Sequence, residues 1–199
     1  MISIGVLGST NGTDLQAIFD AINNNIINGS VKVVISNRKK AFILKKAVAN
    51  GVETHYVSQK NKTREEFDRE VSGLLKDYDI ELILLIGFMR ILSKEFCYEW
   101  QDKILNVHPS LLPKYAGGMD TNVHQKVLNN GETETGCTIH FVTEKVDGGP
   151  ILIQKSCPVE YDDTVESLKK KVQTLEGHAF VEAINLITSR QYVRTQKNK

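Results

Sequence analysis

An asparagine and a histidine lie two residues apart in the stretch NVHPSLLPKYAGG, at Asn106 and His108. If the apolar run before them is a strand, residues i and i+2 point to the same face of the sheet. Pro109 cannot donate a ladder hydrogen bond and holds His108 in an extended conformation, so the strand ends here. An imidazole moves protons near neutral pH, and an asparagine amide donates hydrogen bonds to a developing oxyanion. The pair therefore predicts a catalytic site at the end of a strand, where open α/β sheets bind their ligands.

An aspartate that could orient this histidine occurs further along the chain, in VDGGP at residues 146–150. Asp147 precedes two glycines, and Asp-Gly is also an ordinary turn sequence between strands. In the functional interpretation, the glycines let the backbone bend closely while the Asp147 carboxylate points at His108. Such a carboxylate would orient the ring and raise the pKa of the histidine. The sequence alone leaves both interpretations open.

A loop of small residues, GSTNGTDLQ at 8–16, follows the first apolar run and opens a predicted helix. The first N–H groups of a helix lack partners and its dipole favours an anion, so this loop could hold a phosphate. The glycine spacing matches neither GxGxxG nor a Walker loop. A tight turn in which Thr13 or Asp14 caps the helix explains the loop equally well. Asp14 would repel a phosphate unless it faces away or bonds a hydroxyl.

Another predicted helix begins at TREE, where Thr63 and Glu66 form a capping box. Arg64 occupies its first turn, where a positive charge is unfavourable. A solvated arginine is the simpler interpretation of Arg64. The functional interpretation is that it binds a carboxylate or a phosphate through both guanidinium nitrogens.

The composition is that of an ordinary soluble protein: 199 residues, 41% of them hydrophobic and 25% charged, with a net charge of +1. A balance so close to neutral argues against nucleic acid or an acidic membrane as a partner. The three cysteines are far apart and lack metal-ligand spacing, so we expect reduced thiols, no metal and a cytoplasmic location. We expect neither a signal peptide nor a membrane span, since no stretch approaches ~18 apolar residues.

Predicted strands and helices alternate in the first half of the chain. Apolar runs predict strands over 2–7, 31–36, 53–57, 81–87 and 103–108, with helices between them after residue 12, over 41–50, from 63 and near 93–99. This alternation predicts an α/β fold with a doubly wound, mostly parallel sheet. TGCTIHFVT and PILIQKSCPV then predict two antiparallel strands added at the sheet edge in the C-terminal half, before a long helix from about 163. We expect a single domain over 1–190 and a polar tail over 191–199.

These segments together resemble the phosphoribosylglycinamide formyltransferases, folate-dependent enzymes of purine biosynthesis. GFMRIL (87–92), NVHPSLLPKY (106–115), TGCTIHFVT (135–143) and VDGGPI (146–151) occur in the family's order and spacing. HPSLLP is shared with other formyl-folate enzymes, whereas GSTNGTDLQAI and the compact length select this family. The resemblance implies a Rossmann-like formyltransferase fold. It also implies transfer of a formyl group from 10-formyltetrahydrofolate, a co-substrate, to the amine of glycinamide ribonucleotide, without a metal.

The resemblance further implies roles for individual residues. Asn106, His108 and Asp147 match the family's catalytic trio. Nucleotide binding is implied for Gly12, Thr13, Asp14, Arg64, Gln173 and Glu176, and folate binding for Met89, Arg90, Ile91, Leu92, Thr143, Glu144, Lys145 and Val146. The chain departs from the family pattern at Asp14, where Asn is usual, and at Thr10, where Gly is usual. The loop after Tyr115 is one residue longer than its common form.

Two classes of alternative remain open. The first is another formyl-folate enzyme, and the hydrolase and methionyl-tRNA members of that group would be expected to add a regulatory or nucleic-acid-binding domain. A sugar-nucleotide formyltransferase would be expected to differ at the first loop. The second class is a non-catalytic nucleotide-binding module, which explains the Gly-rich loop but leaves Asn106, His108 and Asp147 as coincidence.

Overall fold

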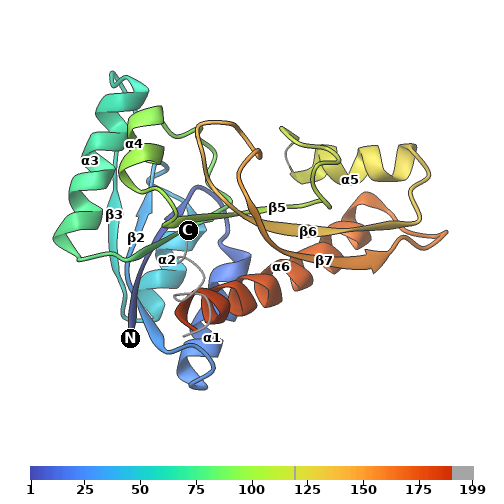
Figure 1. Ribbon diagram of the computed structural model, residues 1–199, viewed down its shortest axis with the longest axis horizontal. Coiled ribbons are helices and arrows are strands. Elements are labelled where there is room, and N and C mark those ends of the chain that lie inside the picture. Colours follow the sequence, from blue (N-terminus) through green and yellow to red (C-terminus); the bar gives the residue numbers. More distant parts are fainter. Residues whose placement is uncertain (119, 190–199) are drawn as a thin grey trace, which may run out of the picture.

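A computed structural model describes residues 1–118 and 120–189, in which helices cover both faces of one seven-stranded sheet (Figure 1). In chain order the elements are β1 (Ile2–Gly8), α1 (Thr13–Asn23), β2 (Gly29–Ser36), α2 (Phe42–Ala49), β3 (Glu53–Tyr56), α3 (Arg64–Asp77), β4 (Leu82–Ile86), α4 (Lys94–Glu99), β5 (Ile104–His108), α5 (Asp120–Asn129), β6 (Glu134–Phe141), β7 (Ile151–Pro158) and α6 (Val165–Thr188). Strands β1 to β5 pair in parallel, and β6 and β7 are antiparallel additions. The predicted fold class is confirmed.

The sheet order is β3-β2-β1-β4-β5-β6-β7, so the chain turns back at β1. It first builds outward through β2 and β3, and then returns to place β4 and β5 on the other side of β1. In open parallel sheets this reversal leaves a crevice at the carboxyl ends of the two central strands, where ligands bind. The topology therefore places the crevice between the ends of β1 and β4.

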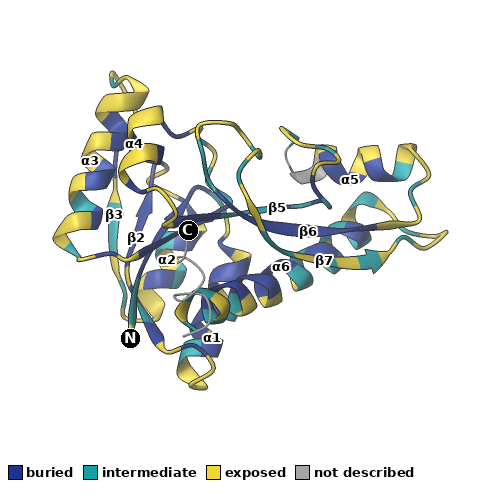
Figure 2. Cartoon of the chain, in the orientation of Figure 1, coloured by how far each residue is buried: buried dark blue, intermediate teal, exposed yellow. Residues whose placement is uncertain are grey.

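Two apolar layers fill the space between the sheet and its helices. Helices α1, α2 and α6 pack on one face, with Ile4 and Val6 of β1 beneath them, whereas Leu7 faces α3 and α4. Strand β4 is buried along its whole length, because a central parallel strand is covered on both sides. The edge strand β7 instead alternates between exposed and partly buried residues (Figure 2).

Of the two interpretations left open for the loop before α1, the one in which Thr13 or Asp14 caps the helix is wrong. Gly12 is the N-cap residue in a left-handed conformation (φ 63°), and no side chain makes a capping hydrogen bond. A Cβ at Gly12 would lie 2.4 Å from Cγ1 of Ile43, so α2 approaches too closely for a larger residue. The first N–H groups of α1 are therefore left without a side-chain cap.

The capping box at Thr63 and Glu66 is confirmed at the start of α3. Helix α5 lies within a stretch to which sequence patterns assigned no element, and α6 begins close to the predicted position. The predicted tail 191–199 and the end of the predicted domain at 190 lie outside the described residues. Among the residues described, no helix has the length and apolar character needed to cross a membrane.

Candidate active site

A cavity of about 530 Å³ lies at the carboxyl ends of β1, β4 and β5, at the crevice that the topology predicts. Its size is within the usual range for small-molecule sites. The walls come from the loop before α1, the segment after β4, the end of β5, the loop between β6 and β7, and one side of α6. Segments far apart in the sequence thus meet around one space.

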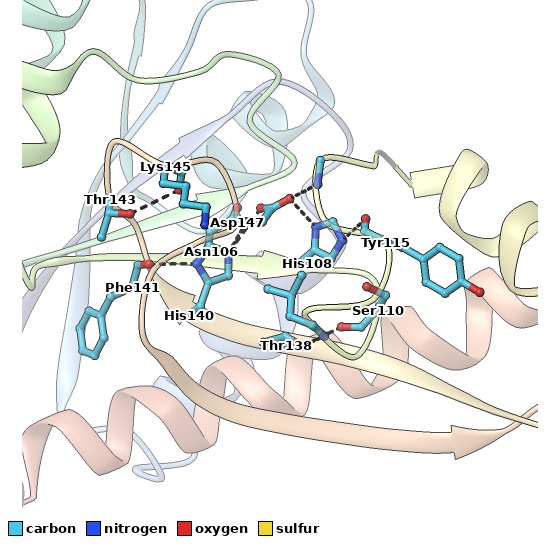
Figure 3. Close-up of polar contacts among 12 residues, drawn as sticks. Asn106, His108, Ser110, Tyr115, Thr138, His140, Phe141, Thr143, Lys145 and Asp147 are labelled. Atoms are coloured by element: carbon cyan, nitrogen blue, oxygen red, sulfur yellow. Dashed lines mark hydrogen bonds and ion pairs between the residues drawn. The ribbon is translucent and has the colours of Figure 1, made fainter. Parts of the chain in front are cut away.

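His108 and Asp147 face each other in this cavity, as the sequence suggested. His108 ends β5 with its side chain 3% exposed, and its Nδ1 atom lies 3.2 Å from Oδ2 of Asp147. The other ring nitrogen, Nε2, is 3.0 Å from the carbonyl oxygen of Tyr115 (Figure 3). Because both nitrogens face oxygen acceptors, only the doubly protonated ring can donate to both. The surroundings are therefore arranged for an imidazolium.

Burial acts against that charge. It lowers the pKa of His108 from its ordinary value, and the Asp147 carboxylate and the Tyr115 carbonyl oppose this effect without cancelling it. Burial also acts to raise the pKa of Asp147, but the adjacent His140 ring, the hydrogen bond from the Gly117 N–H and the charge of His108 together hold it below its usual range. The arrangement is an ionised acid beside a histidine that can gain a proton when negative charge develops nearby.

Asp147 is held in place by the backbone around it. Its own φ of 51° is left-handed, and its carboxylate Oδ2 accepts a 2.8 Å hydrogen bond from the N–H of Gly117. A Cβ at Gly149 would lie 1.8 Å from the carbonyl oxygen of Phe141, so the loop after Asp147 presses directly on the end of β6. The glycines of VDGGP thus serve the close approach that aims Asp147 at His108.

Asn106 is joined to a second histidine, which sequence reasoning did not single out. The amide nitrogen of Asn106 lies 3.1 Å from Nε2 of His140, whose Nδ1 donates to the carbonyl oxygen of Phe141 at 2.9 Å. A neutral His140 of that tautomer accepts one Asn106 hydrogen and leaves the second for a substrate oxygen. Nε2 of His140 is also 3.5 Å from Oδ1 of Asp147, so His140 connects Asn106 to the His108–Asp147 pair.

Pairing between β5 and β6 brings these side chains together. Asn106 stands opposite His140, and His108 stands opposite Thr138. The Thr138 hydroxyl donates to the carbonyl of Ser110 at 2.7 Å and accepts from the Leu112 N–H at 3.0 Å, which fixes the HPSLLP segment. Alternation along TGCTIHFVT could have indicated His140, but its position opposite Asn106 depends on a pairing register that is set far away in the chain.

At one end of the cavity lie the residues expected to bind a nucleotide. Thr13 and Asp14 at the start of α1 line it, and so do Gln173 and Glu176 of α6. Gly12 does not line the cavity but shapes the turn, and its carbonyl accepts a 2.7 Å hydrogen bond from Lys46. Burial raises the pKa of Asp14 to about 7, an effect that the charge of Lys46 only partly offsets.

The other end of the cavity is more apolar. Met89, Arg90, Ile91 and Leu92 line it after β4, and Thr143, Lys145 and Val146 line it from the loop after β6. The exposed apolar side chains among them, including Ile91 at 54%, suit a flat aromatic ligand. The guanidinium of Arg90 lies 4.1 Å above the Phe67 ring and donates to Gln59. Its position is therefore fixed by neighbouring side chains.

Two residues of the expected set lie away from the cavity wall. Arg64 is exposed in the first turn of α3 and does not line the cavity. Its positive charge interacts with the carboxyl group of buried Asp68. Arg90, which lines the apolar end of the cavity, interacts with the same Asp68 carboxyl. Glu144 pairs with Lys94 at 3.2 Å and likewise does not line the cavity. Helix position was predictable for Arg64, but the direction of its side chain was not.

No group of three His, Cys, Asp or Glu side chains able to hold a metal ion is found in the described part of the chain. An asparagine amide, an imidazole and a carboxylate meet at the centre of the cavity. A helix N-terminus lies to one side and an apolar wall to the other. This arrangement can bind an anionic molecule and a flat apolar one with their reactive groups meeting at the centre, and it can stabilise an oxyanion there.

The family model described as formyl transferase matches residues 2–184. The chain is 42% identical over 176 residues to the phosphoribosylglycinamide formyltransferase of Escherichia coli (strain K12), covering 88% of this chain and 82% of that protein. It is 41% identical over 189 residues to the trifunctional purine biosynthetic protein adenosine-3 of Gallus gallus. The matched region covers 94% of this chain but only 18% of that much longer protein. The crystal structure of glycinamide ribonucleotide transformylase 1 from Symbiobacterium toebii superposes with a TM-score of 0.90 at 39% identity, covering 94% and 87% of the two chains.

Proposed function

The chain belongs to the formyltransferase family, and we propose that it is a phosphoribosylglycinamide formyltransferase. It would transfer the formyl group of 10-formyltetrahydrofolate to the amine of glycinamide ribonucleotide, a step of purine biosynthesis in the cytoplasm. The observation that carries this proposal is the position of Asn106, His108 and Asp147 at the centre of the cavity, between the uncapped start of α1 and an apolar end. The free cysteines agree with a reducing compartment.

Each substrate has an end of the cavity that suits it. The nucleotide would place its phosphate at the uncapped start of α1 and its ribose toward Gln173 and Glu176. The pterin of the folate would lie against the segment 89–92 and the loop at 143–146. This assignment puts the amine and the formyl carbon together at the side chains of Asn106 and His108.

The proposed reaction needs an oxyanion site and two proton movements. The amine nitrogen attacks the formyl carbon, a C–N bond forms, and the carbonyl oxygen becomes an oxyanion. The second hydrogen of Asn106 donates to that oxygen, and the positive charge of protonated His108 nearby stabilises it electrostatically. The attacking nitrogen then loses a proton and the folate nitrogen gains one as its bond to the formyl carbon breaks. Asp147 supports the charge of His108, and it relays a proton through water.

The direct test mixes the full chain with glycinamide ribonucleotide and 10-formyltetrahydrofolate and follows formation of the deformylated folate. We expect deformylation that requires the nucleotide, together with formylated nucleotide as the second product. Equal deformylation without the nucleotide would instead indicate a hydrolase. No turnover together with normal binding of both ligands would favour a non-catalytic module.

His108→Ala separates binding from chemistry. Both ligands should still bind the variant, because the walls at the two ends of the cavity are unchanged, whereas formyl transfer should collapse. Retained turnover in this variant would refute the role assigned to His108.

A further inference from the structure

Asp14 is a buried acid at the point where the proposed function places an anion. It occupies the first turn of α1, lines the cavity and is 5% exposed. Its Oδ1 atom is buried and makes no hydrogen bond to any described residue. A buried carboxyl oxygen without a partner is costly, and its place in a cavity wall indicates that a ligand supplies the partner.

The charged groups around Asp14 do not neutralise a second anion. The positive charge of Lys46, in α2, interacts with the Asp14 carboxyl. The same ammonium group donates a 2.7 Å hydrogen bond to the Gly12 carbonyl and also interacts electrostatically with Asp20 of α1. Glu176 of α6 lines the same cavity. The thiol of Cys137, in β6, interacts electrostatically with both Glu176 and Asp14. Strand β4 brings only apolar side chains. Helix α6 also brings Lys169 to the cavity wall. A phosphate dianion placed here would meet two acids, the shared Lys46 and Lys169, so the cations balance the acids but leave the charge of the phosphate unmatched.

We propose that Asp14 couples nucleotide binding to proton uptake: the phosphate group binds when the Asp14 carboxyl is protonated, and that carboxyl then donates a hydrogen bond to a phosphate oxygen. The proton comes from solvent and returns to it when the nucleotide leaves. This inference rests on the proposed function, because it takes the phosphate end of the cavity from it. In the ionised form the carboxylate occupies the positive end of α1 in place of the phosphate.

The size of the effect follows from the fraction of protein in the protonated form. With a pKa of about 7 in the free protein, half of the Asp14 carboxyls are protonated at pH 7. If only that form binds, the apparent dissociation constant rises about tenfold for each pH unit above 7. Close to one proton is then taken up for each nucleotide bound at about pH 8.

The test is calorimetric titration of glycinamide ribonucleotide into the full chain between pH 6.5 and 8.5, in two buffers that differ in ionisation enthalpy. The unmodified protein is compared with Asp14→Asn, which keeps the shape but cannot titrate, and with Asp77→Asn. The latter is a matched control because Asp77 is an exposed helical aspartate, at the end of α3, that does not line the cavity. The phosphate and amine of the ligand titrate equally in all three proteins, so differences between them report on Asp14.

We expect the affinity of the unmodified protein and of Asp77→Asn to fall by about tenfold per pH unit above 7 relative to Asp14→Asn, with uptake of about one more proton. Parallel pH profiles in all three proteins, with equal proton uptake, would overturn the inference while leaving the proposed function intact. If Asp14→Asn does not fold, absence of proton uptake by the unmodified protein at pH 8 overturns it as well. Failure of the unmodified protein to bind the nucleotide at any pH would refute the proposed function itself.

Discussion

Asp147→Asn tests whether this carboxylate sets the charge of His108. The two facing atoms are 3.2 Å apart, and unit charges at that distance attract by about 5 kcal/mol at an effective dielectric constant of ~20. Solvent in the open cavity weakens the attraction, and an opposite charge this close usually moves a pKa by ~1–3 units. In the variant, burial still lowers the pKa of His108, but the Asp147 charge, which is the strongest effect opposing it, is absent. We therefore expect that pKa to fall by about one to three units.

The consequence for catalysis is a smaller population of imidazolium at neutral pH. The maximal rate of formyl transfer, kcat, should fall by about 100-fold at pH 7.5, and its decline with rising pH should begin at a lower pH than in the unmodified protein. The measurements are kcat as a function of pH and an NMR titration of the His108 ring. Asp162→Asn, at an exposed carboxylate before α6, is the matched control and should leave both unchanged. An unaltered ring pKa in Asp147→Asn would refute the reasoning.

Four further changes have defined outcomes. Asn106→Ala removes one oxyanion donor and should raise the barrier by ~3–4 kcal/mol, seen as a 10²–10³-fold loss of kcat with a nearly constant KM for the nucleotide. Arg64→Ala should leave the nucleotide KM within about twofold, because Arg64 does not line the cavity; a large increase would return Arg64 to the nucleotide site. Gly149→Ala puts a Cβ 1.8 Å from the Phe141 carbonyl oxygen and should lower the unfolding free energy by about 1–3 kcal/mol and reduce activity, measured by urea denaturation and kcat. In Asp14 the folded state holds its proton more tightly than the unfolded state, with a pKa of about 7 against 3.8, so this acid costs stability as pH rises between those values. Asp14→Asn should therefore be as stable as the unmodified protein near pH 4 and more stable by up to ~4 kcal/mol at pH 8 in urea unfolding; a difference independent of pH would contradict this.

Local patterns were sufficient to predict the fold class and most of its elements, although α5 was missed. The unbroken apolar run of β4 indicates a strand covered on both sides, and TREE indicates the first residue of α3. The alternative in which Thr13 or Asp14 caps α1 failed for a tertiary reason. Gly12 caps it because Ile43, on a different helix, leaves no room for a Cβ.

Only those features of the site that depend on residues close together in the sequence could be predicted. The two-residue spacing of Asn106 and His108 follows from strand geometry, and the turn sequence around Asp147 suggests a close approach. His140 was missed because its place opposite Asn106 follows from the antiparallel pairing of β5 with β6, which no local pattern encodes. The direction in which Arg64 points depends in the same way on how α3 lies against the sheet.

The chain leaves the sheet at the end of β5 and comes back to it in the adjacent strand β6, after the excursion over 109–133 that contains α5. Both ends of that excursion are anchored to one another by the strand ladder, so residues can be gained or lost within it without displacing Asn106 from His140. The entropy of closing such a loop grows only slowly with its length. Relatives can therefore remodel the part of this excursion around α5, provided that Tyr115 and Gly117 keep their contacts with His108 and Asp147.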